Sequence, residues 1–246
     1  MPLIAKSTYK RPNWLFNGHL ETIFPALFRQ VTVPFPTRER IETSDQDFLD
    51  LDWYRTGSPR LIIISHGLEG NSRRPYMLGM VREFLNIGFD TLAWNYRGCG
   101  EELNRKPIFY HSGATYDLDQ VVKQAELHYE EIFLIGFSLG GNLTLKYLGE
   151  IKNSRKKIKK AVAISVPLDL GKSCEQISSG QNLIYSKRFL QTLIKKVESK
   201  ADLFPEEFSL DKLKKVKTLR DFDDVFTGPL HGFADAEEYY QVNSSL

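Results

Sequence analysis

Short apolar runs alternate with helix-like stretches through the first two thirds of the chain. Runs of consecutive apolar residues, typical of strands buried on both faces of a parallel sheet, occur at 61–65, 89–94, 131–137 and 161–166. Amphipathic helical spacing is found between or after them, at 76–85, 116–129 and 139–151. Strands that alternate with helices predict an α/β fold: a mostly parallel sheet with helices on both faces and right-handed crossovers.

The segment before this unit predicts an arm and a hairpin. Residues 14–28 are rich in aromatic side chains and predict a short helical arm, in which we expect His19 to have a structural role. Two strand-like runs within 31–55 flank a turn signal at 43–46. The second run alternates apolar residues with the acids Asp50 and Asp52, which predicts an antiparallel edge hairpin whose acids face water.

From residue 169 onward the pattern predicts helices without strands. The stretch 188–197 places apolar residues on one face and lysines on the other, the apolar set being Phe189, Leu190, Leu193, Ile194 and Val197. We expect a lid over a pocket; a basic amphipathic face on membrane lipid is the alternative. Further helices are predicted at 210–216 and 235–242. The predicted organisation is a core with its arm at 1–168, a helical lid at 169–234, and a further core segment beginning at 235–246.

Composition restricts the class of protein further. A chain of 246 residues with 41% hydrophobic content can bury one sizeable core, and its net charge of +2 gives no reason to expect a nucleic-acid partner. The cysteines, Cys99 and Cys174, form no C-x-x-C pair, so we expect a reducing compartment, no zinc or other metal site, and a cytoplasmic protein. The basic run 155–160 is predicted to be a solvated loop between a helix and a strand.

The sequence Gly136-Phe137-Ser138-Leu139-Gly140 joins a predicted buried strand to a predicted helix. A Gly-x-Ser-x-Gly motif in this context predicts a nucleophile elbow, a sharp turn that holds the serine in a strained conformation above the strand. Gly136 and Gly140 are needed because side chains there would collide with the neighbouring strand and helix. Ser138 is the candidate nucleophile. The alternative is an ordinary strand-to-helix turn whose serine caps the helix.

A serine nucleophile also needs donors for the negative charge that develops on the substrate oxygen. The amide of Leu139 lies at the predicted helix N-terminus, where it can face that charge. The segment 65–70, Ser-His-Gly-Leu-Glu-Gly, directly follows a buried strand, and there we expect the Leu68 amide to be the second donor. His66 precedes the nucleophile in the chain and is tied to this turn, so we expect a structural role for it.

Six short motifs occur in order along the chain: Asn-Gly-His-Leu at 17–20, His-Gly-Leu-Glu-Gly at 66–70, Asn-Tyr-Arg-Gly-Cys at 95–99, Tyr-His-Ser-Gly at 110–113, Gly-Phe-Ser-Leu-Gly-Gly-Asn at 136–142 and Pro-Leu-His-Gly-Phe at 229–233. The ordered set resembles the YheT-like branch of the α/β-hydrolases across essentially the whole chain. The resemblance implies a serine hydrolase of carboxylic esters, with Ser138 as nucleophile and a helical lid after the sixth strand.

The chain departs from this branch near its end. Members continue past a segment like 235–240 into two more strands, which carry the catalytic Asp and His. We therefore expect a truncated or split hydrolase, with its last strands missing and its sheet ending at the 161–166 strand. The replacements in Ser–Asp–His order are Asp169 and His231; their ordinary roles would be a helix cap and a turn histidine.

Two function classes follow. The first is a serine carboxylic-ester hydrolase that forms an acyl-serine intermediate on a small-molecule or lipid ester and uses no cofactor. The second is a truncated, inactive remnant that acts as a binding or interaction protein, since loss of the base alone costs on the order of 10⁶ in turnover. An exposed sheet edge would favour self-association. A dinucleotide-binding fold is disfavoured because no G-x-G-x-x-G follows the first strand of the alternating unit, and a dehalogenase because its nucleophile is Asp.

Overall fold

A six-stranded mixed sheet organises the computed structural model, which describes residues 6–151 and 155–246. The strands are β1 (Thr37–Glu42), β2 (Phe48–Tyr54), β3 (Arg60–Ser65), β4 (Asp90–Asn95), β5 (Glu131–Phe137) and β6 (Ile158–Ile164), and their order in the sheet is β1-β2-β4-β3-β5-β6. The pairs β1–β2 and β2–β4 are antiparallel, and the remaining pairs are parallel. The predicted mostly parallel sheet is confirmed.

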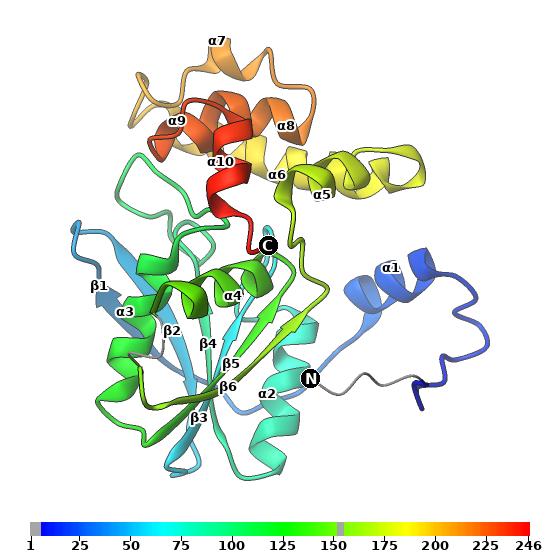
Figure 1. The fold of residues 1–246 in the computed structure, drawn as a ribbon, viewed down its shortest axis with the longest axis vertical. Helices are drawn as coiled ribbons and strands as arrows, with labels where there is room; N and C mark the ends of the chain where they lie inside the picture. The colour runs from blue at the N-terminus through cyan, green and yellow to red at the C-terminus, as the bar shows by residue number, and fades with distance from the viewer. Residues whose placement is uncertain (1–5, 152–154) are drawn as a thin grey trace.

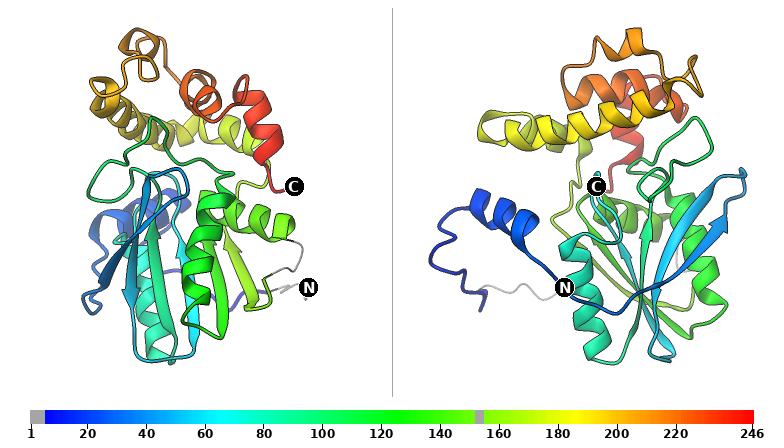
Figure 2. Two further views of the ribbon diagram at one scale, coloured as in Figure 1. Left: turned by 90° about the vertical axis from the view of Figure 1, so that its left-hand side faces the viewer. Right: turned by 180° about the vertical axis from the view of Figure 1, so that it is seen from behind.

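Helices cover both faces of this sheet (Figures 1 and 2). They are α2 (Pro75–Asn86), α3 (Thr115–Glu126) and α4 (Leu139–Ile151). Side chains alternate between the faces along β3: Leu61 and Ile63 belong to the apolar cluster with α3 and α4, whereas Ile62 and Ile64 pack with α2. A strand whose four inner positions, 61–64, are all apolar is therefore buried on both sides, as its sequence predicts.

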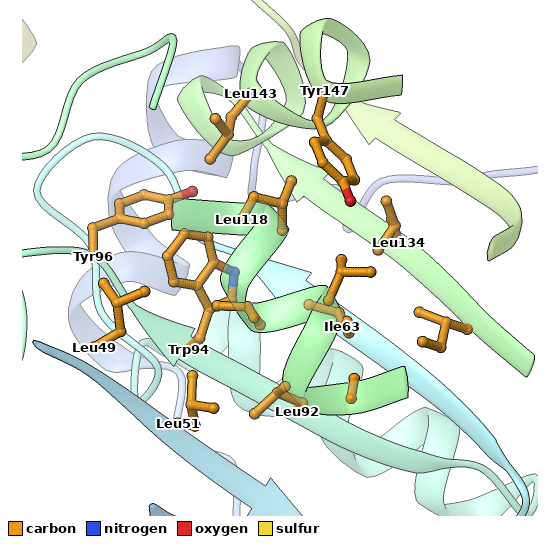
Figure 3. Packing of buried hydrophobic residues seen from close by; sticks show 14 of the residues in the cluster. Leu49, Leu51, Ile63, Leu92, Trp94, Tyr96, Leu118, Leu134, Leu143 and Tyr147 are labelled. Atoms are coloured by element: carbon orange, nitrogen blue, oxygen red, sulfur yellow. The ribbon is translucent and has the colours of Figure 1, made fainter. Parts of the chain in front are cut away.

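The larger cluster lies between the sheet and the helices α3 and α4 (Figure 3). Trp94 is fully buried at its centre and donates its indole N–H to Ser65 Oγ at 2.9 Å. Leu143 and Tyr147 reach this cluster from α4, one helical turn apart. Each fully buried side chain of this size contributes about 1.5–3 kcal/mol, so the cluster fixes α4 firmly against β5 and hence the position of the turn that joins them.

The acids of the hairpin do not face water, so that expectation was wrong. Asp50 and Asp52 are 2% and 0% exposed, because β2 is an inner strand that pairs with both β1 and β4. Arg40 and Arg38 of β1 bind these two carboxylates through paired hydrogen bonds, the shortest being 2.7 Å in each case. The alternation reflects a row of ion pairs in which the carboxylates are buried and the arginines are partly exposed, and the strand sequence alone cannot distinguish this from a solvated face.

The basic run 155–160 is also not simply a loop. Strand β6 begins at Ile158, three residues earlier than predicted, and includes the exposed Lys159 and Lys160. Arg155 binds Asp119 at 2.6 Å and Glu126 at 2.8 Å, both on α3. The strand forms the edge of the sheet in the part of the chain that the structure describes, as predicted, and Val162 on it is 53% exposed.

A layer of helices lies across one end of the sheet, at the top of Figure 1. We call α5 to α10 the helical layer: α5 (Leu170–Ile177), the 3₁₀ turn η1 (Gly180–Asn182), α6 (Leu183–Ala201), α7 (Leu210–Leu213), α8 (Leu219–Phe222), the π-helical turn η2 (Asp223–Thr227), α9 (Gly228–Leu230) and α10 (Ala236–Asn243). The apolar face predicted for 188–197 packs into its core. Lys196, expected on the solvent side, is instead largely buried beside Glu69. The predicted boundary at residue 234 falls inside this layer, since α10 packs against α5 and η2.

The N-terminal arm carries α1 (Gly18–Phe28), capped by Asn17, whose side chain accepts the Leu20 N–H. Figure 1 shows this helix beside the sheet and below the helical layer. His19 shares hydrogen bonds with the Tyr185 hydroxyl, at 2.8 Å, and with the Gln181 side chain, at 3.1 Å. Its position is therefore structural, as expected, but its partners are polar groups of the helical layer. None of the described helices is both long and apolar enough to cross a membrane.

Candidate active site

Ser138 occupies the sharp turn between β5 and α4. Its φ is +50°, in the left-handed region that residues other than glycine rarely adopt. The amides of Gly141 and Asn142 donate to its carbonyl oxygen, which starts α4 immediately after the turn. A Cβ atom at Gly136 would lie 2.1 Å from the Gly140 carbonyl oxygen, and one at Gly140 would lie 2.5 Å from that of Ser65. Both glycines are therefore required by the close approach of backbone that the sequence predicted.

The 66–70 turn lies directly against Ser138. Register pairs Ser65 at the end of β3 with Gly136 of β5, and a Cβ atom at Gly67 would be 3.3 Å from the Cβ of Ser138. Leu68 and Leu139 line the same cavity as Ser138. Within 6–151 and 155–246, no hydrogen-bond acceptor is recorded for either leucine amide. The structure thus brings together the serine and the two residues predicted as oxyanion donors.

His66 holds this turn in place. Its ring is completely buried and lies 3.9 Å, centroid to centroid, from that of Tyr96, whose hydroxyl donates to the His66 carbonyl oxygen at 2.7 Å. Burial lowers the pKa of His66 to about 3, so the imidazole is neutral at pH 7. The histidine is structural, as the sequence indicated.

Two cavities meet at Ser138. The first cavity, of about 180 Å³, lies beneath the helical layer and is lined mostly by apolar side chains, together with His111, His231 and Asp223. The second cavity, of about 440 Å³, lies between the core, α1 and α6, and its wall includes Ile23, Tyr76 and Phe189. Leu68 and Ser138 border both. Apolar cavities with a few polar groups on either side of one hydroxyl suit a substrate with two apolar arms.

His231, the candidate base, lies in the first cavity with Ser138. Its ring packs on that of His111, with the centroids 4.3 Å apart. Burial, and to a smaller degree the charge of Arg97, lower the pKa of His231 to about 4, and burial also keeps the pKa of His111 well below its usual value. Among the described residues, no hydrogen bond joins either imidazole to Ser138 Oγ.

Asp169, the candidate acid, is bound elsewhere. It caps α5 by accepting the Lys172 N–H at 2.9 Å, and its carboxylate pairs with the Lys172 ammonium at 3.0 Å. The cavity wall includes its neighbours Pro167 and Leu170 but not Asp169 itself. The structure brings His231 to the cavity and leaves Asp169 in the helix-cap role that the sequence also allowed.

Asp223 is an acidic residue of the first cavity that the sequence analysis did not identify. It lies in the π-helical turn η2, lines the first cavity, and accepts the Tyr240 hydroxyl at 2.7 Å. Burial raises its pKa to about 6, against the opposing effect of hydrogen bonds from Thr227 and Tyr240. A signal was present: Asp223 follows Leu219 by four residues and precedes Phe226 by three, the spacing of a shared helix face.

Metal ligands are not gathered at this site: within the described ranges, no three His, Cys, Asp or Glu side chains are grouped so that they could hold an ion. Cys99 is buried beside Lys196, and its burial raises the pKa of the thiol to about 11, which keeps it protonated.

Comparison with known proteins places this geometry in a family. Residues 60–226 match the family model for the α/β-hydrolase fold, and this region contains Ser138 and the 66–70 turn. The chain belongs to the α/β-hydrolase fold family. Within it the chain belongs to the YheT-like branch, because it is 34% identical to the Escherichia coli (strain K12) protein named "Putative esterase YheT" over 239 residues, which cover 94% of this chain and 70% of that relative.

Other relatives in the family carry lipase names. The chain is 34% identical to the monoacylglycerol lipase of Saccharomyces cerevisiae over 75% of its own length, and 27% identical to the human phospholipase ABHD3 over 96%. It spans 43% and 61% of the lengths of these two proteins. A solved structure of the Pyrococcus furiosus esterase Pf2001 shares the fold, with a TM-score of 0.52 and 24% identity over 62% of each chain.

Proposed function

We propose that this chain is a serine hydrolase of carboxylic esters in which Ser138 is the nucleophile. The observation that carries the proposal is the conformation of Ser138: it is held at φ +50° between β5 and α4, against the 66–70 turn and at the junction of two apolar cavities. This is the nucleophile elbow of the fold family, and a strained residue at a cavity is the kind of outlier that marks a functional site.

The chemistry is acyl transfer through an acyl-serine intermediate. Ser138 Oγ attacks the ester carbonyl carbon, its proton passes to a base, and the carbonyl oxygen takes up the negative charge between the amides of Leu68 and Leu139. The C–O bond to the alcohol then breaks, and the alcohol leaves with the proton from the base. Water repeats the sequence on the acyl-serine and releases the acid.

His231 is the base that we propose for this chain. A pKa of about 4 leaves its imidazole neutral and able to accept a proton at pH 7, but makes it a weak base. No carboxylate is hydrogen-bonded to it in the part of the chain that the structure describes, and Asp169 is engaged by Lys172. Loss of the orienting acid from a serine triad costs on the order of 10⁴ in turnover, so we expect acylation to be detectable and turnover to be slow.

The substrate that we propose is an ester with apolar groups on both sides of the carbonyl, either a small molecule or a lipid. The two cavities support this choice, and so do the names of the esterase, monoacylglycerol lipase and phospholipase relatives. No cofactor is needed for this chemistry. Two free cysteines and no disulfide between them are typical of a protein in a reducing compartment, so we propose the cytoplasm as its location.

The second candidate is a catalytically inactive binding protein with the same scaffold. The observation that favours it is that Ser138 Oγ has no recorded hydrogen bond to either cavity histidine within the described ranges. Such a protein would bind an apolar ligand in the cavities without releasing products.

Labelling with a fluorophosphonate probe distinguishes the two functions. The hydrolase proposal predicts a single covalent adduct, located on Ser138 by peptide mass spectrometry and lost in Ser138→Ala. It also predicts a stoichiometric burst of p-nitrophenol from p-nitrophenyl butyrate, followed by slow turnover. If neither the label nor the burst is observed, the enzyme proposal is removed. An adduct that persists in Ser138→Ala, for example on Ser165 in the second cavity, would contradict the assignment of the nucleophile.

A further inference from the structure

A largely buried ion pair connects helix α6 to the 66–70 turn. The Nζ atom of Lys196 lies 2.6 Å from Oε1 of Glu69, and the two side chains are 14% and 7% exposed. Glu69 directly follows Leu68, one of the two proposed oxyanion donors. The helix that roofs the second cavity is therefore in direct contact with the segment that would hold the oxyanion.

The turn itself needs to be held. Glu69 has a φ of +53°, which costs a residue with a side chain roughly 1–2 kcal/mol relative to an ordinary conformation. Tyr110 supports it twice, since its hydroxyl donates to Glu69 Oε1 at 2.9 Å and accepts the Glu69 N–H at 2.7 Å. Lys196 completes the arrangement, with its ammonium 4.8 Å from the centroid of the Tyr110 ring. The strained residue is thus fixed by two side chains from different elements.

Lys196 is charged despite its burial. Burial lowers the pKa of Lys196, but the adjacent Glu69 carboxylate and the hydrogen bonds to Glu69 and to the Cys99 sulfur outweigh burial and raise this pKa above its ordinary value. The lysine also contacts the Cys99 sulfur at 3.2 Å. An ion pair in a poorly hydrated position is costly to break, because either partner left alone would be a buried, uncompensated charge.

We propose that Lys196 and Glu69 are positioning residues for the oxyanion hole: their ion pair holds the 66–70 turn so that the Leu68 amide faces the same oxygen as the Leu139 amide. The inference rests on the proposed function, and it adds a coupling between α6 and the chemistry. Lys196 reaches Glu69 only while α6 is packed against the 66–70 turn. The oxyanion site is therefore complete when the cavity is covered, and loosens when α6 lifts away.

The test is the kinetics of fluorophosphonate labelling in Lys196→Met, Glu69→Gln and the double variant. Removal of a whole oxyanion donor costs about 10²–10³ in rate, so a mispositioned donor should lower the maximal labelling rate by roughly 10- to 100-fold. The concentration for half-maximal rate should stay unchanged, because Lys196 lines neither cavity and Gln keeps the size and shape of Glu69, which borders the second cavity. The double variant should label no more slowly than the slower single variant, because the pair acts as a unit.

Lys200→Met is the matched control. Lys200 lies one turn further along α6, is fully buried, and donates to the carbonyl oxygens of Lys106 and Ile108 rather than to the 66–70 turn. This variant should be less stable than wild type but should label at the wild-type rate under conditions where it is folded. Equal labelling rates for wild type and Lys196→Met, or equal losses in Lys196→Met and Lys200→Met, would overturn the proposal.

A second measurement tests whether Lys196 holds the 66–70 turn, and it does not depend on labelling. Absence of any label on Ser138 would count against the proposed function but not against this role of Lys196. Amide hydrogen exchange by NMR can follow Gly67, Glu69 and Gly70, whose N–H groups bond to Tyr76 Oη, Tyr110 Oη and the Gly67 carbonyl oxygen. Lys196→Met should accelerate exchange at these amides at least 10-fold, and Lys200→Met should not. Unchanged exchange in Lys196→Met would show that the lysine does not hold the turn.

Discussion

Arg97 and Asp117 are joined by two parallel hydrogen bonds, of 2.8 and 2.7 Å, with both side chains only 2% exposed. The same guanidinium binds Asp47 at 3.1 Å and Asp45 at 2.6 Å. The loop after β4, the hairpin turn before β2 and the first turn of α3 therefore meet at one cation. Because three carboxylates share it, this arginine controls the charge balance of a buried site.

Replacing Arg97 by Met should destabilise the protein by about 3–5 kcal/mol, because buried carboxylates lose their counter-charge. The free energy of unfolding in urea at pH 7 measures the loss. Burial raises the pKa of Asp117, so the loss should shrink as the pH falls and this carboxyl takes up a proton. Arg82→Met is the matched control: its contact with Glu83 is exposed on both sides, and such pairs contribute at most about 1 kcal/mol. A loss below 1 kcal/mol for Arg97→Met would contradict the argument.

Gly140→Ala tests the close packing of the turn around Ser138. The new Cβ atom would lie 2.5 and 2.6 Å from the carbonyl oxygens of Ser65 and His66, so backbone would have to move. We expect a loss of about 1–3 kcal/mol and loss of Ser138 labelling. Gly149→Ala in the same helix meets no atom within 4 Å and should stabilise the protein by about 0.5–1 kcal/mol. Equal effects of the two substitutions would show that the turn tolerates a side chain.

The strands and the turn at Ser138 could be predicted because local pattern determines them. Apolar runs fixed β3 to β6 within a few residues, and α4 begins at Leu139 and ends at Ile151, as its spacing predicted. The motif Gly-x-Ser-x-Gly predicted a conformation that only these glycines permit. The family resemblance was carried by the same short segments and is confirmed by the comparisons.

Long-range charge pairing could not be predicted. Asp50 and Asp52 alternate with apolar residues just as solvated acids would. Only the register of β1 against β2 brings arginines to them, and the pairing of β2 with β4 makes β2 an inner strand. Lys196 likewise lies on the polar side of its helical pattern, but its partner Glu69 is 127 residues away. Asp169 follows a predicted strand in the sequence, and a role for it in catalysis stays a prediction.

The two edges of the sheet differ in how they are protected, and this predicts how copies of the chain associate. Edge strand β1 carries charged residues at four of its six positions, which discourages pairing with another strand. Edge strand β6 carries the apolar run that includes the half-exposed Val162. We expect concentration-dependent self-association, which Val162→Lys should reduce.

Sedimentation velocity across a range of protein concentrations measures this association. Thr37→Lys on the opposite edge is the matched control and should leave it unchanged. If Val162→Lys associates as strongly as wild type, or if wild type remains monomeric at the highest concentrations, β6 is not an association edge.

The pH dependence of stability should contain two opposing contributions from the first cavity. Asp223 has its pKa raised to about 6, so between pH 4 and 6 the folded state holds a proton that the unfolded state releases. Its contribution to stability is fully present below pH 4 and is lost as the pH rises through 6, amounting to about 3 kcal/mol. The pKa of His231 is lowered to about 4, so between pH 4 and 6.5 this histidine is neutral in the folded state and protonated in the unfolded state. Its contribution therefore rises by a similar amount, about 3 kcal/mol, over almost the same range.

Single variants separate these contributions. Asp223→Asn removes the contribution that falls with pH. Between pH 4 and 6.5 its free energy of unfolding should therefore increase by about 3 kcal/mol relative to the change in wild type. His231→Asn removes the rising contribution, so its free energy of unfolding should fall by about 3 kcal/mol relative to wild type over the same pH range. Urea unfolding at pH 4, 5 and 6.5 provides the comparison, with slopes referred to wild type so that the other titrating groups cancel. An Asp223→Asn profile parallel to wild type would mean that the carboxyl ionises normally, and that the cavity is more hydrated than its buried lining indicates.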